Sequence, residues 1–224
     1  MDIYHVLNRG VEKRDVVIDN YDRLRFVQNL FLFNDSQEVP STTRKGAGIR
    51  EKNASSSSTH TRNLLVRIYA WCLMTNHYHL LLSPINNDPS KLSLFMKKIN
   101  MGYAKYFNER YNRSGYLWQG RYKKIPVKQD PHFLYIPYYI HLNPLDLTMP
   151  EWRKGSVIRP QEALKHLKAY RWSSYLDYAG GKNFPSLIQK NFLLESIGSP
   201  KVQERETLRI ISSPEIASHS LNIE

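Results

Sequence analysis

Two histidines separated by one residue, His77 and His79, are the side chains best spaced to hold a metal ion together. They lie in a run of apolar and strand-forming residues from 70 to 82, which predicts a buried strand. Because side chains alternate along a strand, both imidazoles point to the same face. Two imidazoles leave room on a metal for a third protein group and a substrate oxygen, which is the condition for catalysis. The alternative is a polar sheet face without a metal, because the pattern is short.

A second candidate for chemistry is Tyr139, in the segment 135–144. If this segment is helical, Tyr139 and Asn143 stand four residues apart on one face. A tyrosine beside a metal-bound phosphate can act as the nucleophile of a transesterification, although its free pKa of about 10 means that it must be activated. The amide oxygen of Asn143 can complete the metal site as a hard ligand. The alternative is structural, because tyrosines also pack helices on sheets and an Asn-Pro pair ends a helix.

The charge of the chain indicates the class of partner. Its 224 residues include 32 Lys and Arg against 20 Asp and Glu, which gives a net charge of +12. This excess favours a polyanion, with nucleic acid ahead of a membrane surface. We expect no membrane span and no signal peptide, because the sequence lacks an apolar run of about 18 residues. The single cysteine, Cys72, excludes a disulfide framework, so we expect a cytoplasmic location.

The stretch 91–128 is both basic and aromatic. It holds ten Lys or Arg residues and one acidic residue, Glu109, with tyrosines and a tryptophan between them. Cations bind phosphates and aromatic faces stack on unpaired bases, which suits single-stranded DNA or the foot of a hairpin. The alternative is a solvated helix face with its aromatic residues in the core. Both interpretations hold in part, and Arg121, Lys123 and Lys124 are the better candidates for DNA contact.

Hydrophobic spacing and turn signals predict strands and helices that alternate along the chain. The expected elements are a strand over 3–8, a helix after 19–22, strands over 64–74 and 77–83, a helix from 89 to about 107, a strand over 122–127, and a helix between Asp130-Pro131 and Pro144. This order suggests an α+β fold in which helices pack on a mostly antiparallel sheet, the ferredoxin-like plan. Pro137 predicts either a kink or a later start for the last helix.

Two regions lie outside this pattern. The stretch 34–63 is rich in serine and glycine and is predicted to be a flexible insertion. The polar region from 181 to 224 is predicted to be a tail that is either disordered or folded onto DNA or the active site. The sequence therefore indicates one domain over 1–180, with the insertion inside it, followed by the tail.

Several segments, taken together, resemble the HUH single-tyrosine transposases, and most closely their REP-associated tyrosine transposase branch. The matching pieces, in order, are Tyr4-His5-Val6-Leu7-Asn8-Arg9-Gly10, Asp22-Arg23-Leu24-Arg25-Phe26, Met74-Thr75-Asn76-His77-Tyr78-His79-Leu80-Leu81-Leu82, Tyr106-Phe107-Asn108, Gly115-Tyr116-Leu117-Trp118-Gln119-Gly120-Arg121-Tyr122-Lys123, Tyr139-Ile140-His141-Leu142-Asn143-Pro144 and Arg171-Trp172-Ser173-Ser174-Tyr175. The resemblance covers residues 1–180 outside the insertion.

The resemblance implies a ferredoxin-like HUH endonuclease domain that acts on single-stranded, hairpin-forming repeat DNA. By this resemblance, His77 and His79 would hold Mg²⁺ or Mn²⁺, with Asn143 as third ligand. Tyr139 would attack the scissile phosphate and leave a 5′-phosphotyrosine and a free 3′-hydroxyl. Relatives work as monomers or homodimers. The residues expected to contact DNA are Arg9, Lys97, Lys105, Trp118, Arg121, Lys123 and Lys124. The alternatives are a catalytically idle protein that binds structured DNA or RNA, and a rolling-circle nickase with the same chemistry.

Overall fold

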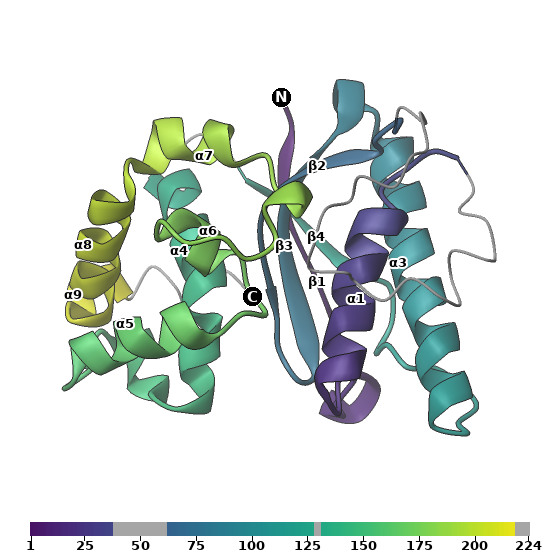
Figure 1. Ribbon diagram of the computed structural model, residues 1–224, viewed down its shortest axis with the longest axis horizontal. Helices are drawn as coiled ribbons and strands as arrows, with labels where there is room; N and C mark the ends of the chain where they lie inside the picture. Colours follow the sequence, from purple (N-terminus) through teal and green to yellow (C-terminus); the bar gives the residue numbers. More distant parts are fainter. Residues whose placement is uncertain (38–61, 128–130, 218–224) are drawn as a thin grey trace.

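A four-stranded antiparallel sheet in the order β2-β3-β1-β4 forms the centre of the molecule (Figure 1). The computed structural model describes residues 1–37, 62–127 and 131–217. The strands are β1 (Ile3–Arg9), β2 (Val66–Leu73), β3 (His77–Pro84) and β4 (Lys123–Val127). With α1 (Asn20–Leu32) between β1 and β2, and α3 (Pro89–Arg110) between β3 and β4, the chain follows the ferredoxin-like plan. The predicted α+β fold class is confirmed.

Both helices begin after an aspartate that caps their first turn. Asp19 accepts a hydrogen bond of 3.0 Å from the backbone N–H of Asp22 at the start of α1. Asp88 does the same for Ser90, with Pro89 at the first position of α3. No helix of the described residues has both the length and the apolar character needed to cross a bilayer.

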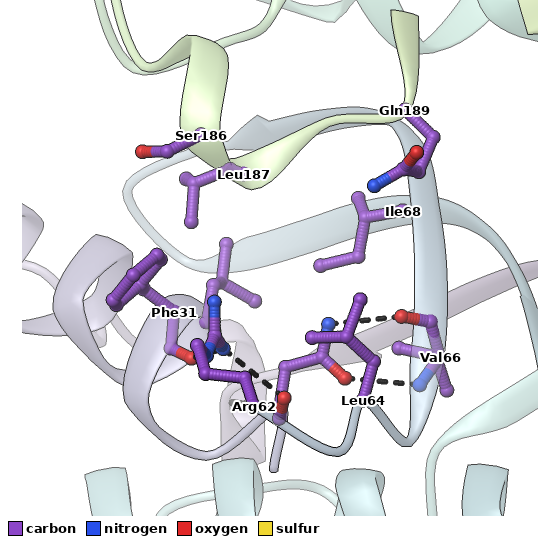
Figure 2. Close-up of a pocket in the computed structure, with 10 residues that line it drawn as sticks. Phe31, Arg62, Leu64, Val66, Ile68, Ser186, Leu187 and Gln189 are labelled. Carbon is purple, nitrogen blue, oxygen red and sulfur yellow. Dashed lines mark hydrogen bonds between the residues drawn. The ribbon is translucent and has the colours of Figure 1, made fainter. Parts of the chain in front are cut away.

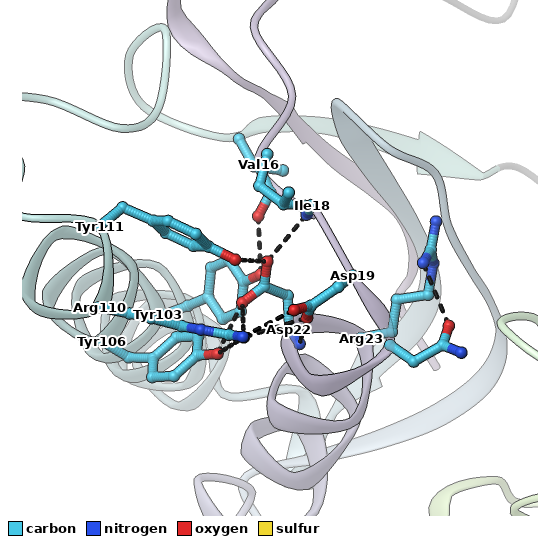
Figure 3. Close-up of polar contacts among 10 residues, drawn as sticks. Val16, Ile18, Asp19, Asp22, Arg23, Tyr103, Tyr106, Arg110 and Tyr111 are labelled. Carbon is cyan, nitrogen blue, oxygen red and sulfur yellow. Dashed lines mark hydrogen bonds and ion pairs between the residues drawn. The ribbon is translucent and has the colours of Figure 1, made fainter.

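A buried carboxylate holds α1 and α3 together (Figure 3). Asp22 is fully buried and accepts hydrogen bonds from the hydroxyls of Tyr106 at 2.6 Å and Tyr111 at 2.8 Å, and from the backbone N–H of Ile18 at 2.8 Å. Arg110 pairs with it at 2.7 Å. Because every lone pair of this carboxylate is engaged, its burial is compatible with a stable fold.

The remaining helices lie on the opposite side of the sheet from α1 and α3 (Figure 1). They are α4 (Pro131–Leu142), α5 (Pro160–Ala169), α6 (Tyr175–Tyr178), α7 (Lys190–Ile197), α8 (Pro200–Ile211) and α9 (Pro214–Ala217), with short 3₁₀ turns η3 (Asn143–Leu147) and η4 (Pro150–Lys154) after α4. Pro137 lies inside α4, so the helix does not start after this proline. In place of the predicted tail, residues 181–217 fold into helices that pack on α5, η4 and β2, so disorder does not describe this region.

The segment 171–174 runs alongside β2. The backbone N–H of Leu73 donates to the carbonyl of Trp172 at 2.8 Å, and that of Ser174 donates to the carbonyl of Trp71 at 3.0 Å. The hydroxyl of Ser174 also lies 2.8 Å from Nε2 of His141 in α4. This explains two of the motif residues as structural: His141 and Ser174 tie α4 to the sheet.

The two ends of the predicted insertion are firmly held, while residues 38–61 lie outside the described residues. The side chain of Asn34 accepts hydrogen bonds from the backbone of Leu65 and Val66 and donates to the Val66 carbonyl at 2.9 Å. Arg62 lies over the ring of Phe31, 3.9 Å from its centroid, and donates to its carbonyl. The cavity beside them (Figure 2) measures about 30 Å³, the volume of about one water molecule, so it is too small for a larger ligand.

Candidate functional site

The histidine pair and the candidate nucleophile meet between the sheet and α4. On β3, Tyr78 points to the α1 and α3 side, where its ring packs 5.1 Å from that of Phe26, so His77 and His79 point to the other side. The two imidazole centroids are 4.9 Å apart. The ring of Tyr139 lies edge-on to His79, with centroids 5.7 Å apart. The structure thus brings together the three side chains that the sequence analysis selected.

A third histidine belongs to the same cluster. His5, on the neighbouring strand β1, is fully buried, and its Nε2 lies 2.9 Å from Nδ1 of His79. Its ring also lies 5.9 Å from that of Tyr139. Because the hydrogen bond occupies Nδ1 of His79, the Nε2 atom of His79 is the one left for a metal.

A hydrogen bond of His77 determines which of its two ring nitrogens carries the proton. Its Nδ1 lies 2.6 Å from Oδ1 of Asn76. Because a carbonyl oxygen can only accept, Nδ1 of His77 carries the proton and Nε2 keeps the lone pair. Nε2 is therefore the atom that each imidazole would offer to a metal ion.

Burial keeps the site histidine neutral. The pKa of His79 is held well below its ordinary value, first by burial and then by the charges of His77, His5, Arg153 and Arg9. A neutral imidazole is the form that binds a metal ion. The presence of Arg9 and Arg153 among these causes also means that two guanidinium groups lie near His79.

Asn143 is fully buried one turn after Tyr139, at the start of η3. Its Nδ2 donates to the backbone carbonyl of Tyr139 at 2.8 Å, which fixes the orientation of the amide. The opposite atom, Oδ1, is buried and has no hydrogen-bond partner among the described residues. A buried amide oxygen left without a donor is a suitable ligand for a hard cation.

These donors fit a divalent ion that also binds substrate. Nε2 of His79, like Oδ1 of Asn143, is buried and lacks a hydrogen-bond partner in the part of the chain that the structure describes. Within those same residues, no three His, Cys, Asp or Glu side chains are grouped to hold a metal. An ion at this place would therefore rely on imidazoles together with amide, phosphate or water oxygens.

The far side of Tyr139 is covered by residues from η3 and η4. Trp152 packs with its ring centroid 6.1 Å from that of Tyr139, and Nη1 of Arg153 lies 3.5 Å from the Tyr139 hydroxyl oxygen. Asp146 accepts from Nε of Arg153 at 2.9 Å, from its Nη2 at 2.6 Å and from Nε1 of Trp152 at 2.7 Å. Tyr139 is itself fully buried between this cluster and the histidines.

The two neighbouring tyrosines of α4 serve packing. Tyr135 and Tyr138 are both 7% exposed. Burial raises the pKa of Tyr138, and its next cause is the charge of Glu206 in α8, so Tyr138 faces the C-terminal helices. Among the tyrosines of α4, the ring contacts with the site histidines belong to Tyr139.

Two of the predicted DNA-contacting cations share the face of the sheet that carries the histidines. Arg9 pairs with His77 across β1 and β3, and Lys123 pairs with Leu7, which in turn pairs with His79. Residues directly opposite each other in an antiparallel sheet point to the same side. Lys123 is exposed on the edge strand β4. Both residues therefore stay candidates for contact with DNA on the histidine face of the sheet.

The other predicted cations lie elsewhere. Lys124 alternates to the opposite face, with its Nζ 4.7 Å from the centroid of the Tyr4 ring. Arg121 and Lys97 line an open surface cavity of about 310 Å³ between α3 and the loop before β4. Lys105 is exposed on α3 and forms an ion pair of 3.7 Å with Glu109. These four residues stay candidates for contacts with DNA outside the histidine site.

Trp118 does not suit the role that the sequence analysis gave it. It is 8% exposed, and its ring packs 5.4 Å from that of Tyr78. Its Nε1 donates to the backbone carbonyl of Asn100 at 3.0 Å. With its ring in the core and its polar atom engaged, Trp118 has little surface on which a base can stack, so we remove it from the DNA-contacting set.

Three parts of the site were not predicted from the sequence: His5, Asp146 and the pair Trp152-Arg153. Alternation along the first strand could have identified His5, because it places His5 and Arg9 on one face. Nothing in the spacing of Asp146 and Arg153 points to Tyr139, since their contact depends on how η3 and η4 fold back after α4.

A comparison with protein families finds the same kind of protein that the sequence motifs resemble. Residues 44–143 match the model of the IS200-like transposase family, and this segment includes His77, His79, Tyr139 and Asn143. A solved structure described as a REP-associated tyrosine transposase bound to a REP hairpin aligns with a TM-score of 0.44 and 11% identity, over 82% of each chain. No curated protein matches this sequence. Residues 44–143 are thus similar to the IS200-like transposase family, and the matched segment ends before Asp146.

Proposed function

We propose, from the premise that residues 44–143 are those of an IS200-like transposase, that this protein is a metal-dependent endonuclease and strand transferase for single-stranded DNA that forms hairpins. It acts through a 5′-phosphotyrosine intermediate on Tyr139. The observation that carries the proposal is the contact between the Tyr139 ring and the ring of His79, with centroids 5.7 Å apart. This contact supports a nucleophile and a metal ligand acting on one phosphate.

In the proposed reaction, His77, His79 and Asn143 would hold Mg²⁺ or Mn²⁺, and the ion would supply positive charge next to the scissile phosphate. The Tyr139 hydroxyl loses its proton to solvent and forms a bond to phosphorus. The electron pair of the broken P–O bond leaves on the 3′ oxygen, which takes up a proton. The reverse attack by a 3′-hydroxyl rejoins strands, so no nucleotide cofactor is needed.

The charge of the chain supports DNA as the partner. The net charge of +12 favours binding to phosphates, and Arg9 and Lys123 lie on the histidine side of the sheet. Their position suits a single strand that enters between the sheet and η4.

The test is formation of a covalent adduct. The protein is mixed with Mg²⁺ or Mn²⁺ and with end-labelled single-stranded hairpin DNA from the flanks of the encoding gene. We expect a protein–DNA adduct that is lost in Tyr139→Phe and kept in the matched variant Tyr138→Phe. An adduct that persists in Tyr139→Phe would falsify the assignment of the nucleophile.

One observation favours a second candidate function, DNA binding without cleavage. Tyr139 is fully buried, with the ring of Trp152 against its own, so DNA can reach its hydroxyl only if some of the side chains that cover it move aside. Hairpin DNA that binds tightly but yields no adduct with either metal ion, in the wild-type protein, would support this candidate over the first.

A further inference from the structure

We propose that Arg153 is a further catalytic residue, whose guanidinium, held in place by Asp146, binds the scissile phosphate while Tyr139 forms its ester. This inference rests on the proposed function. It concerns residues that lie after the segment matched by the family model, in η3 and η4.

The guanidinium of Arg153 lies next to the atom of Tyr139 that would react. Nη1 of Arg153 lies 3.5 Å from the hydroxyl oxygen of Tyr139, and its Cζ lies 5.5 Å from the centroid of the Tyr139 ring. The charge thus sits where the new bond between oxygen and phosphorus would form. Positive charge that is already in place when the phosphate charge redistributes lowers the barrier of the reaction.

A carboxylate holds this charge in place. Asp146 accepts from both Nε and Nη2 of Arg153, at 2.9 and 2.6 Å, so the two groups form a planar, two-bond pair. This pair uses one edge of the guanidinium and turns Nη1 toward Tyr139. Trp152 donates to the same carboxylate at 2.7 Å and packs 4.8 Å from the guanidinium carbon, which fixes both partners.

The guanidinium is also more accessible than the tyrosine. The side chain of Arg153 is 28% exposed, whereas Tyr139 is fully covered. The guanidinium is therefore the part of this cluster that an incoming phosphate can meet before the tyrosine. Arginine suits this task, because its fork of N–H donors matches the oxygens of a phosphate group.

A purely structural role for Arg153, as the clasp that closes η4 over α4, makes different predictions. A clasp would affect the stability of the fold and the binding of DNA. A group that contacts the phosphate during ester formation would affect the rate of that step at saturating DNA and leave the affinity for the substrate nearly unchanged.

The experiment measures the single-turnover rate of adduct formation at saturating hairpin DNA with Mn²⁺, together with the Kd for the same DNA in a Tyr139→Phe background. For Arg153→Ala we expect a rate about 100-fold lower, with Kd changed by less than about threefold. We expect millimolar guanidinium ion to restore part of that rate, which a clasp would not allow. Arg153→Lys retains the positive charge but loses the forked N–H donors, so its rate should lie between those of the wild-type protein and Arg153→Ala.

Two variants complete the design. Arg159→Ala removes an exposed arginine that pairs with Glu162 at 3.0 Å, and it should keep the wild-type rate. Asp146→Asn should slow the reaction through misplacement of Arg153. A wild-type rate in Arg153→Ala overturns the role of Arg153. So does a slower rate that comes with a lower melting temperature and is not restored by guanidinium. In both cases the adduct on Tyr139 still supports the proposed function. Absence of any wild-type adduct overturns both.

Discussion

Nε2 of His5 and Nδ1 of His79 are joined by a buried hydrogen bond of 2.9 Å across the two central strands of the sheet. The bond fixes the orientation of the His79 ring and leaves its Nε2 directed away from β1. A histidine that holds a ligating histidine in this way tunes the site without binding the metal itself.

Loss of this hydrogen bond should weaken metal binding. For His5→Ala we expect the affinity for Mn²⁺ to fall by about 10- to 100-fold, the usual effect of removing the partner of a ligating imidazole. Calorimetric titration of the DNA-free protein with Mn²⁺ measures this directly. His166→Ala, in α5, is the matched histidine control, and equal affinities in both variants would contradict the role of His5.

Replacement of either proposed histidine ligand should abolish DNA cleavage but leave DNA binding in place. We expect His77→Ala and His79→Ala to abolish adduct formation with hairpin DNA, because each variant loses the metal ion that would supply positive charge next to the scissile phosphate. The Kd for that DNA should change little, since affinity comes largely from contacts between cations and phosphates. Fluorescence anisotropy and denaturing gels give the two readouts. If both variants cut DNA normally, the metal site lies elsewhere.

The two lysines at the start of β4 should act differently. Lys123 shares the histidine face, whereas Lys124 lies over Tyr4 on the opposite face. We expect Lys123→Ala to weaken binding and to reduce the slope of log Kd against log salt by about one. Lys124→Ala should have a smaller effect, and a larger effect of Lys124 than of Lys123 would place the DNA on the other side of the sheet.

The buried carboxylate between α1 and α3 should be essential for stability. Asp22→Ala leaves two tyrosine hydroxyls without their acceptor and removes one of the two carboxylates that pair with Arg110, and we expect the free energy of unfolding to fall by about 2–4 kcal/mol. Urea unfolding measures the change. Asp15→Ala, at an exposed position, should change stability by less than about 0.5 kcal/mol. Similar values for the two variants would show that the network contributes little.

Two glycines test the docking of the C-terminal helices on η4. Gly155 has a φ of +63°, and a Cβ added there would lie 2.2 Å from the carbonyl oxygen of Ser213. Gly115 has a φ of +84° with open space around it. Both alanine variants carry backbone strain of about 1–2 kcal/mol. In urea unfolding, we expect the free energy of unfolding of Gly155→Ala to be about 1–3 kcal/mol lower than that of Gly115→Ala, because of the clash with Ser213. Equal losses would mean that Ser213 does not rest on η4.

The sequence predicted the sheet and its helices well because each element carried its own local signal. Asp19 marked the start of α1 and Pro89 the start of α3, and the alternation around Tyr78 placed both histidines on one face of the sheet. Trp118 was misjudged because an aromatic residue among cations fits both a core and a DNA surface. The C-terminal helices were missed because charged residues are frequent along α8, and Arg153 because its contact with Tyr139 arises from tertiary folding.

The pairing of residues 171–174 with β2 has a consequence for the design of shorter versions of the chain. Without this segment, the backbone N–H of Leu73 and the carbonyl of Trp71 lose their partners, and β2 becomes a bare outer strand of an apolar sheet. Such strands recruit other chains. A truncation before Arg171 should therefore aggregate even though all four strands and the histidine pair remain in it.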